Sequence, residues 1–415
     1  MLRAWINIDK GERKTVKKII SLILAAAMLL SVCIFASAEQ SGELRFSDDG
    51  DFTILQISDP QDDQYPAYDM LRLIELSIAQ TDPDLIVFTG DIVEDSRIGD
   101  FGVDGENGRE GVRIEDISGN LDYETTLKNV KATCDAVFEA AEKAGIPFAI
   151  TQGNNDYRSG ISNEDWLKIY GEYEHCLVKD ESPDEEGRID YNLEIKGSDG
   201  NAAFNLWMMD TRSSTVKEDQ IEWYKQECAA LTEANGGNLV PAMVFQHINV
   251  AEIGNLFEPC RFWDEGARNV GTKFYRLNKD IASGVNSGAV EPGQTSEQFT
   301  AWKECGDVIG AFFGHWHSEG YSGVYDGIEL GMTYGCEFAK PGPYGVRVIT
   351  LHEDDILNYD NDLFVYTGSV TKGTEKLEKQ IDEPYKEPAN IFEKIGAFFV
   401  NSAVNLYNMI LKLFV

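Results

Sequence analysis

Short apolar runs recur along the chain, and most of them end in a polar residue or a glycine. They are rich in β-branched and aromatic side chains and too short for helices, which is typical of buried strands. The predicted strands cover 52–58, 85–89, 146–151, 204–209, 239–246, 308–313, 328–333, 346–351 and 364–370. Between them, apolar residues at helical spacing predict helices over 67–80, 122–144, 217–231 and 296–305. This alternation predicts an α/β fold with a site along one edge of its sheet, where the strands end.

Two segments interrupt the alternation. Residues 95–120 are rich in glycine and acidic side chains, and residues 259–294 hold no sustained apolar run. Both are predicted to be inserted surface loops, and their positions in the chain would put them at the rim of the site.

The N-terminus has the three parts of a secretory signal peptide. Basic residues come first, an apolar run covers 19–35, and Ala36-Ser37-Ala38 follows. This order predicts cleavage after Ala38, and therefore a secreted or cell-surface protein. The alternative is an uncleaved anchor helix, because the run nears the ~18 residues that begin to span a bilayer.

The remainder divides into three predicted parts. Residues 39–371 would form the folded domain, and 372–390, which are charged and contain Pro384, would form a linker. Residues 391–415 are mostly apolar with asparagines at helical spacing, which predicts a helix that buries most of its circumference. That helix would pack on the protein itself or a partner, or it would contact a membrane.

The composition is strongly acidic, with 71 Asp and Glu against 36 Lys and Arg and a net charge of -35. Such a surface repels phosphate backbones and anionic headgroups. This argues against nucleic acid as a partner and against electrostatic docking on anionic lipid. A small substrate is favoured over a polyanion for the same reason.

Six cysteines remain after residue 38. Their even number permits disulfides in an exported chain, and the spacing leaves the pairing open. None of them belongs to a C-x-x-C pair, which argues against a zinc site built from thiolates.

Side chains that could hold a metal follow five of the predicted strands. They are Asp59, Asp91, Asn154, His247 and the pair His315 and His317, which include three of the five histidines. Carboxylate, amide and imidazole groups together suit Mn, Fe or Zn better than Ca or Cu(I). One carboxylate between two groups of ligands could bridge two ions roughly 3.5–4 Å apart, an arrangement used in phosphoryl transfer.

The order of these motifs resembles the calcineurin-like metallophosphoesterase superfamily, whose usual pattern is D-x-H, G-D, G-N-H-D/E, H and G-H-x-H. In this chain the motifs read Asp59-x-Gln61, Gly90-Asp91, Gly153-Asn154-Asn155-Asp156, His247 and Gly314-His315-x-His317. Their flanking residues, Q-I-S-D and F-Q-H-I, are similar to the branch related to purple acid phosphatases. The resemblance implies a four-layered α/β/β/α sandwich, with two mixed sheets flanked by helices.

The resemblance also implies a role for each matched residue. Asp91 would bridge two divalent metal ions, which would be Mn, Fe or Zn. The remaining ligands of the first metal would be Asp59, Gln61 and His317. Those of the second would be Asn154, His247 and His315. A hydroxide bridging the metals would attack the phosphorus of a small phosphorylated substrate.

Three positions depart from the family pattern. Gln61 replaces a histidine and could ligate only through its amide oxygen, which is a weaker ligand for these metals. Asn155 stands where the family has a histidine that protonates the leaving group beside an acidic partner, here Asp156. An asparagine cannot act as a general acid. Glu94 stands where purple acid phosphatases have a tyrosine ligand, so a colourless protein is expected.

These features lead to two hypotheses. The first is an exported, metal-dependent phosphoesterase that hydrolyses phosphomonoesters or phosphodiesters, which the bridging Asp91 and the three histidines favour. The alternative is a surface binding protein that keeps the fold but has lost efficient turnover, which Gln61 and Asn155 favour.

Overall fold

The computed structural model describes residues 43–98, 123–181, 187–338 and 342–366. The predicted signal peptide, the predicted linker and the predicted helix at 391–415 lie outside the described residues, as does most of the segment 95–120. The boundaries of the folded domain therefore stay a prediction.

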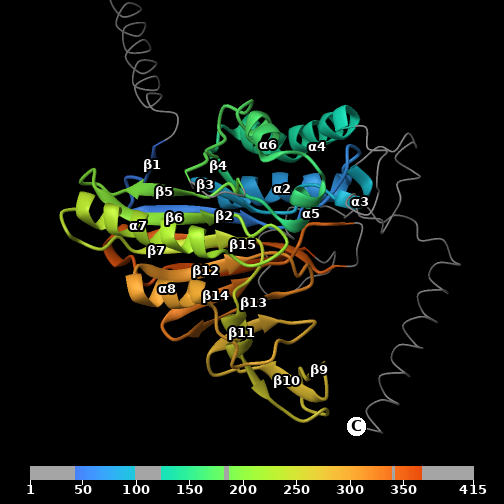
Figure 1. The fold of residues 1–415 in the computed structure, drawn as a ribbon, viewed down its shortest axis with the longest axis vertical. Coiled ribbons are helices and arrows are strands. Elements are labelled where there is room, and N and C mark those ends of the chain that lie inside the picture. Colours follow the sequence, from blue (N-terminus) through green and yellow to red (C-terminus); the bar gives the residue numbers. More distant parts are fainter. Residues whose placement is uncertain (1–42, 99–122, 182–186, 339–341, 367–415) are drawn as a thin grey trace, which may run out of the picture. The chain divides into compact units, whose positions relative to one another are not determined.

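The first sheet has five strands in the order β16-β15-β2-β3-β4 (Figure 1). Its parallel part comprises β2 (Asp51–Ile57), β3 (Leu85–Thr89) and β4 (Phe148–Thr151). The strand β15 (Tyr344–His352) runs antiparallel to β2 on one side and to β16 (Asp360–Tyr366) on the other. The sheet is therefore mixed, as expected.

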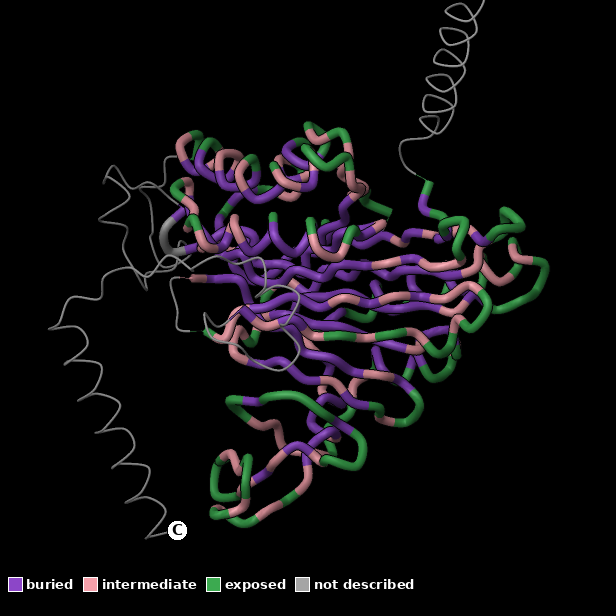
Figure 2. The backbone as a smooth tube through the Cα atoms, turned by 180° about the vertical axis from the view of Figure 1, so that it is seen from behind, coloured by how far each residue is buried: buried purple, intermediate pink, exposed green. Residues whose placement is uncertain are grey.

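The second sheet has eight strands in the order β1-β5-β6-β7-β12-β14-β13-β11. Its centre is parallel and consists of β6 (Ala202–Met209), β7 (Ala242–Gln246), β12 (Val308–Phe313) and β14 (Ile328–Met332). The outer strands are β1 (Leu44–Arg45), β5 (Tyr191–Lys196), β13 (Gly320–Tyr325) and β11 (Ala282–Val285). Strands of both sheets are buried along most of their length (Figure 2).

Helices cover the outer face of each sheet. The helices α2 (Tyr68–Thr81) and α4 (Tyr123–Ala144) contribute Leu73 and Phe138 to a core that also holds Ile54 and Phe245 from the two sheets. The helices α7 (Glu218–Ala234) and α8 (Glu297–Cys305) form a second core with the eight-stranded sheet around Trp302. The result is the predicted four-layered α/β/β/α sandwich. Shorter helices are α3 (Asp95–Ile98), α5 (Asn154–Arg158) and α6 (Asn163–Tyr170), and the 3-10 turns are η3 (Ala251–Leu256) and η4 (Glu353–Asp355).

The helix ends follow from local sequence. Ser296 caps α8 by accepting a hydrogen bond from the backbone N–H of Phe299. Gly306 ends the same helix with a φ of 80°, and Gly145 follows α4 with a φ of 69°. Glycine adopts this left-handed conformation without steric cost, so both helices end where the sequence predicts.

The prediction that 259–294 is a loop was wrong. This segment forms most of a three-stranded sheet, β8 (Phe257–Pro259), β10 (Lys273–Leu277) and β9 (Arg268–Val270), and it then contributes β11 to the main sheet. Only Tyr275 and Leu277 of β10 are buried, so the sequence contains no apolar run from which this strand could be predicted. β5 was missed because half-buried side chains alternate with buried ones along it, and β13 because half-buried and exposed residues interrupt its buried ones.

Among the helices that the structure describes, none combines the length and the apolar character that crossing a bilayer requires.

Candidate metal centre

Five parallel strands from both sheets bring the predicted ligands together. The strands β2, β3 and β4 of the first sheet lead into Asp59, Asp91 and Asn154. The strands β7 and β12 of the second sheet lead into His247 and the His315/His317 pair. Because the carboxyl ends of parallel strands lie on the same edge of a sheet, each ligand follows its strand to one common site.

The carboxylates and imidazoles form two groups that share Asp91. One group contains Asp59, Asp91 and His317, the other contains Asp91, His247 and His315, and within each the donor atoms lie within 4.8 Å of one another. The Nε2 atom of His247 is 3.2 Å from Oδ2 of Asp91 and 3.3 Å from Nδ1 of His315. The Nε2 atom of His317 is 3.4 Å from Oδ1 of Asp59. A single carboxylate common to two donor groups is the arrangement expected of a bridging ligand.

The two predicted amide ligands lie at the same edge. The side-chain amide of Asn154 is 3.2 Å from Nε2 of His247. Gln61 donates a 2.6 Å hydrogen bond from Nε2 to the Glu94 carboxylate. Gln61 and Glu94 are two of the positions that depart from the family pattern, and the structure pairs them directly.

The site fits divalent cations because it contains a buried anionic oxygen that the protein does not satisfy. Oδ1 of Asp59 is fully buried and accepts no hydrogen bond from any residue that the structure describes. An isolated buried carboxylate oxygen is costly unless a cation or a donor compensates it. Its neighbours are the imidazole nitrogens of His317 and His247, at 3.4 and 4.0 Å, which are themselves typical metal donors.

Backbone strain is concentrated at the same residues. In the described part of the chain, seven non-glycine residues have a positive φ, and four of them are predicted ligands: Asp59 (49°), Gln61 (39°), Asp91 (50°) and His315 (71°). Each such conformation costs on the order of 1–3 kcal/mol and persists where the surrounding structure enforces it, as it does at ligand-binding sites.

Asp91 and His247 form a buried charged pair. Burial alone would raise the pKa of Asp91, but His247 and hydrogen bonds from Asn155 outweigh burial and lower this pKa to about 2. Burial alone would lower the pKa of His247, whereas Asp91 and Asp59 raise it to about 10. A metal at this site therefore competes with a proton for the imidazole.

Two contacts orient the histidine ligands. Nδ1 of His247 is 2.9 Å from the carbonyl oxygen of Thr89, which turns Nε2 toward Asp91. Nδ1 of His317 is 2.8 Å from the Glu337 carboxylate, which turns Nε2 toward Asp59. Partners of this kind fix the tautomer and direction of a metal-binding imidazole. Sequence reasoning missed Glu337, which belongs to no motif and comes close only through the fold.

The motif glycines permit the loops to approach closely. A Cβ atom on Gly90 would lie 2.8 Å from the Cα atom of Gly153 and from Nδ1 of His247, and one on Gly153 would collide with Asp91. These positions are therefore restricted to glycine by contact within the site itself.

Asn155 and Asp156 are the candidate catalytic residues, because the resemblance places them where the family has the leaving-group acid and its acidic partner. Asn155 touches Asp91 twice, through a backbone hydrogen bond of 2.7 Å and a side-chain hydrogen bond of 2.6 Å. Asp156 is fully buried and accepts hydrogen bonds from the backbone N–H groups of Ile92, Val93 and Gly153. Burial and the charge of Asp91 raise the pKa of Asp156 to about 7. Asp156 thus joins the loops after β3 and β4, which is a positioning role.

An apolar pocket adjoins the candidate site. Trp316 lies between the two histidines of its motif, is half-exposed, and has its ring 5.4 Å from that of His315. Its indole N–H donates to Oδ1 of Asn249, two residues after His247. The other residues lining the pocket are Ile253, Phe257, Gly288, Ala289, Val290, Glu319 and Tyr321. Several of them come from the segment whose strands the sequence did not reveal.

Comparison with known proteins agrees with this geometry. The family model "Calcineurin-like phosphoesterase" matches residues 52–319. Two relatives from Arabidopsis thaliana are named "Probable inactive purple acid phosphatase 14" and "Probable inactive purple acid phosphatase 29". The first is 26% identical over 80% of this chain and 84% of its own length. The second is 25% identical over 77% of this chain and 79% of its own length.

Solved structures with a similar fold include a dimetal phosphatase from Danio rerio and a structure titled "Structure of PhoD". The first is 13% identical with a TM-score of 0.42, and it covers 73% of this chain and 93% of its own. The second is 11% identical with a TM-score of 0.44, and it covers 89% of this chain and 79% of its own.

Proposed function

We propose that this chain, which belongs to the calcineurin-like phosphoesterase family, hydrolyses small phosphoric esters with two divalent metal ions held at its strand-end site. The observation that carries the proposal is the sharing of Asp91 by two groups of donor atoms. Mn, Fe and Zn are the metals that the mixture of carboxylate, amide and imidazole donors favours.

The residues that would hold the metals divide between the two groups. Asp59, Gln61 and His317 would hold one metal and Asn154, His247 and His315 the other, with Asp91 common to both. When bound, the two ions supply the Lewis-acid chemistry that polarises a phosphoryl group and generates a nucleophile from water near neutral pH. The chain itself fixes the ligands through Thr89, Glu337 and the strained strand ends.

The lack of a general acid at position 155 limits which leaving groups, and therefore which substrates, this chain can accept. Asn155 lies against Asp91 and has no proton that it can transfer. A leaving group must therefore depart as an anion that is already stable, such as an aryl oxide. The exposed ring of Trp316, which lies beside His315, offers an aromatic leaving group a surface to stack on at the edge of the site. We therefore favour aryl phosphates over alkyl phosphates as substrates.

A second candidate is a binding protein of the same fold with little turnover. The replacement of two family histidines by Gln61 and Asn155 favours it, as do the names of the two plant relatives. Retention of Asp91 and all three histidines at the site favours the enzyme.

The test is hydrolysis of p-nitrophenyl phosphate and of its bis-ester by protein stripped of metal and reloaded with Mn, Fe or Zn. We expect metal-dependent turnover, and the ratio of the two rates identifies monoester or diester preference. Turnover no greater than that of Asp91→Ala with every metal would contradict the enzyme and leave the binding protein.

Replacing Trp316 by alanine should raise the KM for p-nitrophenyl phosphate about tenfold and change kcat little, because the indole contacts the aromatic group and not the phosphorus. Steady-state kinetics measure both constants, and glycerol phosphate should show no change in KM. Trp263→Ala is the matched control, since Trp263 is also an exposed tryptophan but does not line the pocket. An equal rise in KM for both substrates would contradict an aryl subsite.

We further propose that the protein is secreted or held at the cell surface. The support is the basic segment, apolar run and Ala36-Ser37-Ala38 at the N-terminus. Membrane contact through 391–415 is part of the same proposal, and fractionation of a chain ending at Asp382 tests it.

A further inference from the structure

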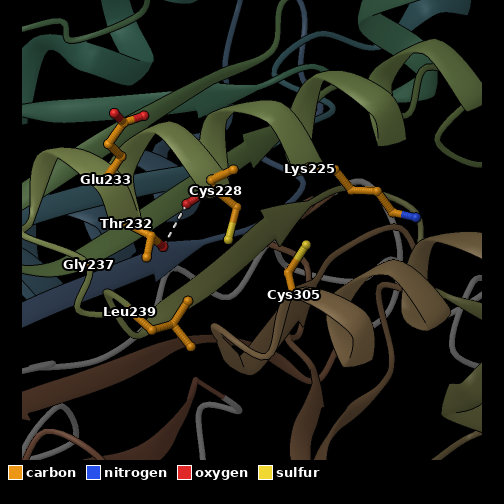
Figure 3. Close-up of a pocket in the computed structure, with 8 residues that line it drawn as sticks. Lys225, Cys228, Thr232, Glu233, Gly237, Leu239 and Cys305 are labelled. Atoms are coloured by element: carbon orange, nitrogen blue, oxygen red, sulfur yellow. Dashed lines mark hydrogen bonds between the residues drawn. The ribbon is translucent and has the colours of Figure 1, made fainter.

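Two cysteines face one another between the outer helices of the eight-stranded sheet. Cys228 lies in α7, and Cys305 is the last residue of α8. Their side chains line the same pocket (Figure 3). The two sulfurs and a carboxylate oxygen of Asp307 all lie within 4.8 Å of one another.

We propose that Cys228 and Cys305 form a disulfide that links α7 to α8 when a low-molecular-weight disulfide, such as oxidised glutathione, reaches them. The sulfurs lie within 4.8 Å of one another, and the helices that carry them pack against each other, so the two thiols are already neighbours in the folded protein. The pair stands far from the metal ligands along β12, which separates Cys305 from His315.

A pocket gives the oxidant access to the pair. It has a volume of about 570 Å³ and is lined by both cysteines together with Lys225, Ala229, Thr232, Glu233, Gly237 and Leu239. Cys305 is half-buried, whereas Cys228 is only 6% exposed. A hydrogen bond from Cys228 outweighs burial and lowers the pKa of the Cys305 thiol to about 7. Because Cys305 is the more exposed of the two thiols, the oxidant would reach it first.

Thiol–disulfide exchange with oxidised glutathione would form the bond in two steps. The Cys305 thiolate attacks one sulfur of oxidised glutathione, forms a mixed disulfide, and releases one glutathione thiolate. The Cys228 thiol then loses its proton and attacks the Cys305 sulfur, which releases the second glutathione as a thiol. The protein loses two electrons and two protons, and the disulfide bond of the oxidant is reduced.

The carboxylate in the cluster does not make it a metal site. Asp307 accepts a 2.9 Å hydrogen bond from the indole N–H of Trp207 and another from the Tyr224 hydroxyl. These contacts anchor two aromatic side chains of the core. Structural zinc takes four ligands, whereas the described residues offer three donors here. One of the three, Asp307, already accepts hydrogen bonds from Trp207 and Tyr224. A disulfide needs only the two thiols.

The experiment treats the full-length, folded protein with oxidised glutathione in the presence of a chelator. Free thiols are then alkylated in acid-quenched samples, and peptides are mapped by mass spectrometry. We expect a cross-linked peptide pair containing Cys228 and Cys305 that separates on reduction. The oxidised protein should also unfold at a higher temperature than the reduced protein, because the link restricts the unfolded chain.

Two variants distinguish a specific disulfide between Cys228 and Cys305 from unspecific oxidation of thiols. Cys228→Ser should give a glutathione adduct on Cys305 and no rise in unfolding temperature. Cys260→Ser is the matched control, since Cys260 is a half-buried cysteine outside the cluster, and it should keep the cross-link. A glutathione adduct on Cys305 of the unmodified sequence without a cross-link would overturn the proposal. Alkylation of both thiols after treatment would do the same. In a parallel sample that contains Zn²⁺ in place of the chelator, a stable zinc complex of the two thiols that prevents the cross-link would overturn the proposal in favour of a metal site.

Discussion

Asp91→Asn is expected to lower metal-dependent hydrolysis by about 10³-fold and to leave no more than one metal ion bound per chain. Asp91 is 1% exposed and contributes oxygen atoms to both donor groups. Asparagine preserves the shape of the side chain but removes the negative charge that two cations share. Calorimetric titration of Mn²⁺ into metal-stripped protein measures the stoichiometry, and p-nitrophenyl phosphate measures the rate.

Asp307→Asn is the matched control for this prediction. Asp307 is also a buried aspartate, but it precedes β12 whereas His315 follows it, so the strand separates it from the site. That variant should bind two metal ions, even if the loss of its contacts with Trp207 and Tyr224 lowers stability. Two metal ions bound to Asp91→Asn with unchanged turnover would show that Asp91 does not bridge them.

The sequence predicted most of the residues that the structure groups at the candidate metal centre, because these residues follow the ends of strands. An apolar strand is visible in the sequence, and the residue that follows a parallel strand must appear at one edge of the sheet. Asp59, Asp91 and His247 could be placed in this way from the amino-acid sequence alone. Gly90 and Gly153 helped to identify the motifs in the sequence. In the structure, the close contacts at both positions leave no room for a side chain.

Residues that act through tertiary contact could not be found in this way. Glu337 lies in no motif, and its 2.8 Å contact with His317 depends on how the chain returns after β14. The cysteine pair is similar, because helices α7 and α8 meet only on the folded sheet. The strands within 259–294 escaped detection because their side chains are mostly exposed and their hydrophobic pattern is weak.

The departures from the family pattern are coupled in the structure. Gln61 and Glu94 appear in the sequence as separate replacements of a histidine and a tyrosine, yet they are joined by a 2.6 Å hydrogen bond. Asn155 likewise donates through its side chain to Asp91, which is common to both donor groups. All three replacements therefore make a polar contact within the site, which favours a site that has adapted to these residues over one that has lost its function.

Asn155→His is the substitution that separates these two possibilities. A histidine at this position can protonate a leaving group, which an asparagine cannot, and general acid catalysis typically contributes about 10²–10⁴-fold. We expect a gain of about 10²-fold in kcat/KM for an alkyl phosphate, whose leaving group is poor, and a smaller gain for p-nitrophenyl phosphate. Rates for a series of esters with leaving groups of different pKa measure this dependence.

Asn155→Ala is the control for the lost contact with Asp91, because alanine removes the side-chain hydrogen bond without supplying an acid. A gain with histidine but not with alanine identifies the missing acid as the cause of slow turnover. If histidine gives no gain with any ester, although Mn²⁺ still binds at two sites, then the metal centre is intact but does not support hydrolysis. That result would assign the retained ligands to binding, because an otherwise competent centre should respond to the acid that it lacks.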